Sequence, residues 1–139
     1  MADEHKLEAQ VLTPEGAVFD GELFQLSTRT AVGEVGIRAR HAPMIARLVP
    51  CELRLHESDS GDPDRYAQGE GWMEVFANRA RVLVAEVRKP EDLDVSELKS
   101  RLEEAEQRLS EAEEGSAARE TAERDKARCE AFIEIAEGG

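Results

Sequence analysis

The spacing of apolar residues changes near residue 90 and divides the chain into two kinds of structure. Before this point apolar and polar side chains alternate, for example over residues 7–11 and 51–55, which is typical of strands with one buried face. After it, apolar residues recur at intervals of three and four, which indicates a helix that packs against another helix: Val95, Leu98, Leu102, Ala105, Leu109 and Ala112. The sequence therefore predicts an α+β chain, with an antiparallel β-sandwich or flattened barrel over residues 1–89 and an antiparallel two-helix hairpin over residues 90–139.

Residues that favour turns separate the short strands expected in the first part. Thr13–Gly16 and Asn78 are each expected to connect two strands, and Asp20-Gly21 is a strong two-residue hairpin signal. Residues 57–64 form a polar loop without an apolar side chain to anchor it. Many short strands joined by such turns favour a sandwich or barrel over a parallel sheet.

The helical part carries its own start and stop signals. Asp94 is expected to cap the first helix, Glu97 completes a capping-box spacing, and Gly115-Ser116 ends the helix. The pairs Glu97–Arg101 and Glu104–Arg108 have the favourable i,i+4 orientation. A second helix is expected from about residue 117 to residue 136. Its apolar stripe is thin and is widened at the far end by Phe132 and Ile135: Ala118, Ala122, Cys129, Ile133 and Ala136. Small side chains bury little area, so the two helices are expected to separate readily.

The charge of the chain excludes two classes of partner. The formal net charge is −13. Residues 1–90 carry 15 acidic and 11 basic side chains, and residues 91–139 carry 16 acidic and 7 basic ones. Such a surface repels nucleic-acid phosphates and anionic lipid headgroups, so we expect no nucleic-acid partner and no direct lipid insertion. No apolar run approaches the roughly 20 residues that span a bilayer, and the first residues do not resemble a secretion signal.

No residue pattern points to catalysis or to a metal. His5, His41 and His56 do not pair in sequence with a candidate nucleophile, and no Gly-Lys-Ser/Thr phosphate loop is present. Cys51 and Cys129 have neither disulfide-framework nor metal-ligand spacing and are expected to be reduced thiols of a cytoplasmic protein. We therefore expect no catalytic residue, no metal and no cofactor.

The segment at residues 32–48, VGEVGIRARHAPMIARL, is more specific than a sandwich alone requires. Gly33 and Gly36 flank a Glu-Val pair, and Pro43 then fixes a rigid extended corner because its ring restricts φ and moves Ala42 out of the helical region. Together with Asp20-Gly21 before it, this segment resembles the epsilon subunit of F-type ATP synthases, in which a glycine-flanked Glu-aliphatic-Gly-Ile precedes a His-Ala-Pro corner. The resemblance covers nearly the whole chain and is most specific over residues 20–48.

This resemblance implies a rotor subunit that couples the membrane c-ring to the gamma subunit of a proton-driven ATP synthase. It places the chain at the cytoplasmic face of the cell membrane as a peripheral part of the complex. The family's contacts with the ring and with gamma fall on six positions here: Glu34, Val35, His41, Ala42, Pro43 and Met44. Glu34 matches the ring-facing turn, and His41 and its neighbours match the gamma contact. The Tyr-Pro-Gly that commonly precedes the histidine is Arg38-Ala39-Arg40 in this chain.

The resemblance also implies a regulatory role for the helical hairpin. In the family the hairpin either folds or extends into the catalytic alpha/beta head, where it blocks ATP hydrolysis. Some bacterial members bind ATP through an Ile/Leu-Asp-x-x-Arg-Ala motif and arginines of the second helix, which match Asp94, Arg124 and Arg128. Glu97 stands where the motif has its arginine, so a negative charge lies where a phosphate would bind and ATP binding is disfavoured.

Two other readings of the sequence remain open. The chain could be a free-standing β-sandwich adaptor that docks a partner through the hairpin, or a soluble nucleotide-sensing module. The rotor reading predicts an exposed patch around Val32–Met44 that binds gamma, whereas the adaptor reading predicts partner binding through the hairpin alone.

Overall fold

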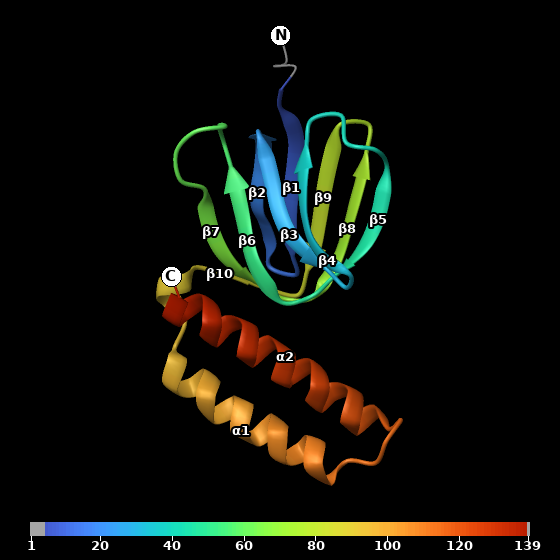
Figure 1. Ribbon diagram of the computed structural model, residues 1–139, viewed down its shortest axis with the longest axis vertical. Coiled ribbons are helices and arrows are strands. Elements are labelled where there is room, and N and C mark those ends of the chain that lie inside the picture. Colours follow the sequence, from blue (N-terminus) through green and yellow to red (C-terminus); the bar gives the residue numbers. More distant parts are fainter. Residues whose placement is uncertain (1–4, 139) are drawn as a thin grey trace. The chain divides into compact units, whose positions relative to one another are not determined.

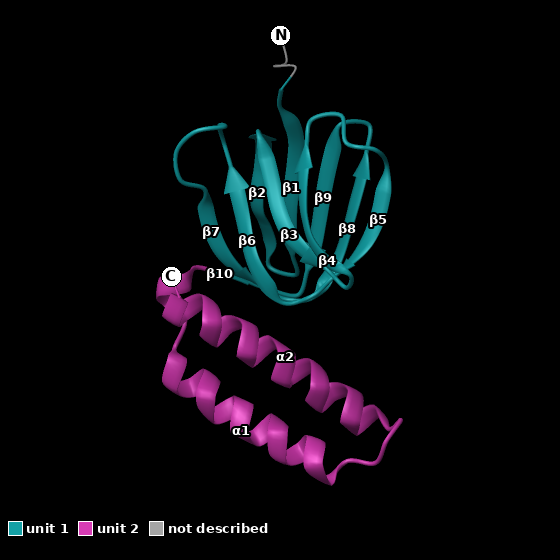
Figure 2. Cartoon of the chain, in the orientation of Figure 1, with its two compact units in different colours: residues 1–88 teal, residues 89–139 magenta. Residues whose placement is uncertain are grey.

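The computed structural model describes residues 5–138, and the chain divides into two compact units, Met1–Arg88 and Lys89–Gly139 (Figure 2). The first unit contains the β-strands and the second contains the helices. No helix within residues 5–138 combines the length and the apolar character needed to cross a membrane.

The first unit is a strand sandwich, as the alternating pattern predicts (Figure 1). Its strands are β1 Leu7–Thr13, β2 Gly16–Leu23, β3 Gln25–Thr30, β4 Gly33–Arg38, β5 Met44–Leu48, β6 Cys51–His56, β7 Asp64–Gln68, β8 Gly71–Phe76, β9 Arg79–Val84 and β10 Val87–Arg88. They follow the order β10-β7-β6-β3-β5-β8-β9-β1-β2, and β4 pairs with β3 off this path. The first part of β3 pairs with β6 and its last residue pairs with β5, so β3 joins the two halves of the sandwich.

The core of this unit consists of the alternate side chains that point inward. Fourteen buried apolar residues form one cluster: Leu7, Ala9, Val11, Leu23, Leu26, Ile37, Leu48, Leu53, Leu55, Met73, Val75, Ala80, Val82 and Val84. Strands β1, β6, β8 and β9 each supply these residues at every second position, which explains why the alternation of apolar and polar residues can be recognised in the sequence.

Two features of β1 and β2 differ from the sequence prediction. The expected hairpin turn at Asp20-Gly21 is wrong, because β2 runs through both residues and pairs them with Gln10 and Ala9 of β1. The turn lies earlier, at Pro14-Glu15, and Gly16 follows it with a φ of 125°. The long β1–β2 ladder outweighs the local turn preference, since a turn at residue 20 would forfeit the pairs on both sides of it. In addition, β1 pairs in parallel with β9, the one departure from antiparallel pairing among the described strands.

The second unit is an antiparallel helix pair that follows a short 3-10 turn, η1 Pro90–Asp92. Helix α1 spans Val95–Glu111, and the Asp94 side chain caps it by accepting a hydrogen bond from the Glu97 amide at 3.1 Å. Gly115, at a φ of 76°, connects it to α2, Ala117–Gly138. These boundaries agree with the cap and break signals in the sequence.

The buried side of α2 differs from the stripe expected from its sequence. Phe132 and Ile135 are buried, whereas Ile133 and Ala136 are only half-buried and Ala118 is exposed. The spacing Ala122-Asp125-Cys129-Phe132 follows intervals of three and four, and it places Asp125 beside α1. Arg108 of α1 therefore pairs with Asp125 at 2.8 Å across the hairpin and not with Glu104, its expected partner on the same helix. The predicted pair Glu97–Arg101 is present at 2.8 Å.

Gly71 provides a test of how closely β8 and β9 approach. It lies opposite Val84 of β9, and a Cβ atom added to it would stand 1.9 Å from the carbonyl oxygen of Leu83. Because that neighbour is backbone of the β8–β9 ladder and not a flexible side chain, we expect Gly71→Ala to destabilise the sandwich by about 3 kcal/mol, measured as the free energy of unfolding in urea. Gly21→Ala is the matched control, because its Cβ would meet only the Phe19 ring at 3.4 Å. Equal stability of the two variants would contradict the packing described here.

Candidate functional site

The corner between β4 and β5 carries the His-Ala-Pro sequence and is held by backbone hydrogen bonds. The amide of His41 donates to the carbonyl of Arg38 at 3.2 Å, which closes a turn before the proline. Arg40 adopts a left-handed φ of 62°, and its amide donates to the Asn78 side-chain oxygen at 2.8 Å. The side chains of Ala42 and Pro43 are exposed, so the tip of this corner faces solvent rather than the core.

Asn78 fastens this corner to the start of the chain. Its side-chain nitrogen donates to the carbonyl of Lys6 at 3.0 Å, and its own carbonyl accepts from the amide of Glu8 at 3.1 Å. Ala77 and Asn78 both have positive φ, at 51° and 61°, which is the geometry of a tight β8–β9 hairpin. The sequence predicted Asn78 as a turn residue. Its hydrogen bonds to Lys6 and Arg40 could not be predicted, because they join segments that lie far apart in the sequence.

His41 and Met44 are half-buried at the two ends of the corner. A ring nitrogen of His41, Nδ1, lies 2.8 Å from the carbonyl oxygen of Ala42. Met44 lies opposite Val75 of β8 and packs against the core cluster. Both side chains therefore support the shape of the corner while Ala42 and Pro43 form its outer surface.

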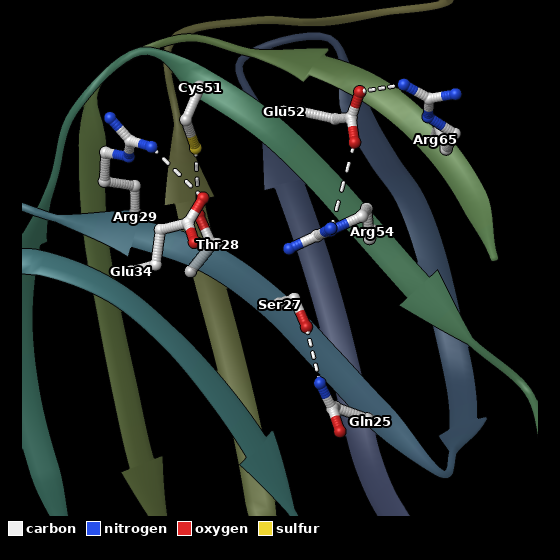
Figure 3. Close-up of polar contacts among 9 residues, drawn as sticks. All are labelled: Gln25, Ser27, Thr28, Arg29, Glu34, Cys51, Glu52, Arg54 and Arg65. Atoms are coloured by element: carbon white, nitrogen blue, oxygen red, sulfur yellow. Dashed lines mark hydrogen bonds and ion pairs between the residues drawn. The ribbon is translucent and has the colours of Figure 1, made fainter. Parts of the chain in front are cut away.

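Glu34 and Val35 lie at the other end of β4, next to the β3–β4 turn. Val32 at the tip of this turn is 97% exposed, and the Thr30 hydroxyl holds the turn by accepting from the Val32 amide and donating to the Gly33 carbonyl. Glu34 pairs with Arg29 across the hairpin at 3.1 Å, as Figure 3 shows. Val35 is half-buried against the core. The structure thus separates the six predicted residues into a turn region and a corner region at opposite ends of one strand.

An exposed apolar surface on β5, β8 and β9 was not recognised in the sequence. We call it the apolar face: Ile45, Trp72, Phe76 and Leu83, which are between 47% and 74% exposed. The three strands lie side by side (Figure 1), and cross-strand pairing places Trp72 directly opposite Leu83. The signal was present in β8, where Trp72 and Phe76 alternate with the buried Met73 and Val75, so both faces of the strand carry large apolar side chains. Large exposed apolar patches are typical of interaction sites in other proteins.

The candidate nucleotide residues lie in the helical unit but do not all line one groove. Asp94 is engaged as the cap of α1, and Arg128 lies over the Phe132 ring at 4.8 Å. A groove of about 400 Å³ runs between the helices, and neither Asp94 nor Arg124 lines it: Glu97, Ser100, Arg101, Glu104, Arg108, Asp125, Arg128 and Cys129. Three carboxylates and three arginines line this groove, so their formal charges balance and the lining has no excess of positive charge for a bound phosphate.

A buried polar cluster in the sandwich serves the fold. The Thr28 hydroxyl donates to the Gln68 side-chain oxygen at 2.7 Å and lies 3.4 Å from the sulfur of Cys51, whose contact with Thr28 is drawn in Figure 3. Burial raises the pKa of the Cys51 thiol, and it also raises the pKa of the Cys129 thiol in α2. Both cysteines therefore stay protonated at neutral pH and are poor nucleophiles. Within residues 5–138 no group of His, Cys, Asp and Glu side chains could hold a metal ion.

Comparison with known proteins identifies the family to which this sandwich belongs. The model of the β-sandwich domain of the ATP synthase delta/epsilon chain matches residues 6–90. The chain belongs to this family. The ATP synthase epsilon chain of Persephonella marina is 39% identical over 128 residues, which cover 91% of this chain and 93% of that one. The ATP synthase epsilon chain of Lactiplantibacillus plantarum is 34% identical over 116 residues, 81% of each chain.

Chains in two solved mitochondrial ATP synthase structures share the fold of this chain. A chain of the Euglena gracilis mitochondrial ATP synthase has a TM-score of 0.79 with 21% identity and covers 95% of this chain and 82% of its own length. A chain of the Tetrahymena thermophila mitochondrial ATP synthase central stalk and c-ring has a TM-score of 0.63 with 15% identity, covering 97% and 99%. The resemblance stated from residues 20–48 is therefore confirmed, and so is the predicted fold class.

The anchoring role of Asn78 can be tested in this epsilon-family chain. Asn78→Ala removes the exposed acceptor for the Arg40 amide and the part-buried donor to Lys6, and a hydrogen bond of this kind contributes about 0.5–1.5 kcal/mol. We expect faster amide hydrogen exchange at Arg40 and Glu8, together with a lower free energy of unfolding. Asn78→Asp is the control, because it keeps the acceptor for Arg40 and loses only the donor to Lys6. Unchanged exchange at Arg40 in the alanine variant would contradict this anchoring.

Proposed function

We propose that this chain is a non-catalytic subunit of the central stalk of an F-type ATP synthase that links the membrane c-ring to the gamma subunit. The observation that carries the proposal is the apolar face on a sandwich of the epsilon family. It presents four large apolar side chains to solvent, and an assembled stalk would cover them. The chain would act at the cytoplasmic face of the membrane, attached through its partner subunits.

The gamma contact is assigned to the apolar face and the neighbouring corner. Phe76 ends β8 beside the β8–β9 turn, and Asn78 of that turn hydrogen-bonds to Arg40 of the corner. Ala42 and Pro43 therefore adjoin the apolar face on one continuous surface. Rigid aromatic side chains such as Trp72 are the residues that most often dominate a protein interface.

The ring contact is assigned to the β3–β4 turn. The hydrogen bonds of Thr30 hold Val32 outward, so the turn can press against a neighbouring subunit without first becoming ordered. Glu34 already pairs with Arg29, and both side chains are more than half exposed. A cationic group of the ring would share Glu34 with Arg29, and such an exposed pair sets orientation more than affinity.

The helical hairpin is assigned a regulatory role through its ability to open. Small residues such as Ala105 and Ala122 form much of its seam, and the side chains of the cross-helix pairs Arg108–Asp125 and Lys99–Glu137 are about half exposed. Exposed pairs contribute only about 0–1 kcal/mol each, so these two ion pairs add little to the free energy that opposes separation of the helices. The extended helices would then reach the catalytic head and slow ATP hydrolysis. Glu97, which stands where the ATP-binding motif has its arginine, disfavours ATP as the ligand that controls this step.

The gamma contact predicts a localised loss of binding. We expect the double change Trp72→Ala and Phe76→Ala to weaken binding to the gamma subunit of the same organism by at least about 10-fold, since buried aromatic residues carry interface energy. Isothermal titration calorimetry of full-length chains measures this affinity. Val18→Ala is the matched control, because Val18 is an exposed apolar residue of β2 outside the apolar face. Equal affinity of the double variant and wild type would remove the apolar face from the gamma contact.

The hairpin prediction concerns ATP hydrolysis by the reconstituted catalytic head. We expect the full-length chain to bind and slow hydrolysis, and a chain that ends at Lys89 to bind without slowing it, because the sandwich has its own core. If both chains bind and neither slows hydrolysis, the hairpin has no regulatory role. Binding that needs the hairpin would instead support an adaptor that docks through its helices.

A further inference from the structure

Arg47 stands among the side chains of the apolar face without a charged partner of its own. It occupies an outward position of β5, directly opposite Trp72, which in turn lies opposite Leu83. Within residues 5–138 no ion pair or hydrogen bond of its guanidinium is found. The other outward arginines nearby are occupied, since Arg79 pairs with Glu8 at 2.9 Å and Arg81 donates to Gln10 at 3.2 Å.

Carboxylates are abundant in this chain, yet none pairs with Arg47 among the described residues. The chain has 31 acidic side chains for 18 lysines and arginines, so a carboxylate is available to most cations on its surface. Glu74 lies on the same face, one position diagonal to Arg47 and opposite Ile45 and Arg81, yet it pairs with neither arginine. The face therefore combines an apolar surface with one unpaired positive and one unpaired negative charge at neighbouring positions.

When a partner covers this face, the charged groups of Arg47 and Glu74 lose their contact with water. A guanidinium that loses its water without gaining a charged partner carries a large desolvation penalty, and the same holds for a carboxylate. A carboxylate can meet the planar guanidinium through two parallel hydrogen bonds, which fixes direction as well as distance. A partner that packs on Trp72 and Leu83 gains affinity by supplying such a group to Arg47, in competition with Glu74 at the diagonal position.

We propose that the apolar face binds a partner surface in which apolar side chains surround a carboxylate, and that this carboxylate pairs with Arg47 and sets the register of the complex. The proposal rests on the stalk function proposed above and adds the chemistry of the partner surface. In the same way, Glu74 favours a partner surface that places a cation opposite it. Together the two charges favour one orientation of the partner and oppose the reversed orientation.

The test uses the full-length chain and the gamma subunit of the same organism. We expect Arg47→Gln to weaken binding by at least about 10-fold, mainly through faster dissociation, because the remaining carboxylate is left buried and unpaired. Arg47→Glu weakens it further. Lys89→Gln is the matched control, because it removes the same charge from an exposed residue outside the apolar face and should change affinity by less than about 3-fold. Surface plasmon resonance gives both rate constants.

A charge reversal on the partner identifies the carboxylate. Among single Asp→Arg or Glu→Arg changes in gamma, one should restore binding to the Arg47→Glu chain and weaken binding to wild type. Equal affinity of wild type, Arg47→Gln and Arg47→Glu overturns the proposal, and so does a loss no larger than that of Lys89→Gln. If the Trp72 and Phe76 double variant still loses binding in that case, the stalk function stands without Arg47. No binding of the wild-type chain to gamma would overturn both.

Discussion

The parallel pairing of β1 with β9 is the constraint on which the rest of the first unit depends. It joins residues 8–12 to residues 79–83 and so connects the β1–β2 hairpin to the sheet that carries β5 and β8. Asn78 stands at the start of this pairing and bonds to Lys6, Glu8 and Arg40 together. The hydrogen bonds that hold the His41 corner therefore depend on this long-range contact, whereas the antiparallel pairing of β5, β8 and β9 places the apolar face.

That contact also marks the limit of what the sequence could predict. Alternation, the Asp94 cap and the Gly115 break are local signals, and each led to the correct element because its physical cause lies within a few residues. The choice of strand partner depends on segments about 70 residues apart. Asp20-Gly21 illustrates the difference, since its local turn preference was overridden by pairing with Gln10 and Ala9.

For a related reason, only part of the candidate site was predicted from the sequence. The positions in the turn and corner were found through a motif, whereas the apolar face consists of single side chains on three strands. An outward Trp72 becomes informative only when Ile45, Phe76 and Leu83 are known to lie on the same surface. In α2, apolar residues at neighbouring positions allowed two stripes, and only the packed helix pair showed that Phe132 rather than Ile133 is buried.

The distribution of charge gives the two units different parts in assembly. The helical part carries most of the net charge of −13, and its carboxylates repel an acidic partner surface at any distance shorter than the screening length. On the outward positions of β5, β8 and β9 the balance is reversed, with Arg47, Arg79 and Arg81 against Glu74. A partner that offers a carboxylate within an apolar surface is thus repelled by most of the chain and attracted to this face. Affinity can come from Trp72 and its neighbours, while the charges decide where and in which direction the partner binds.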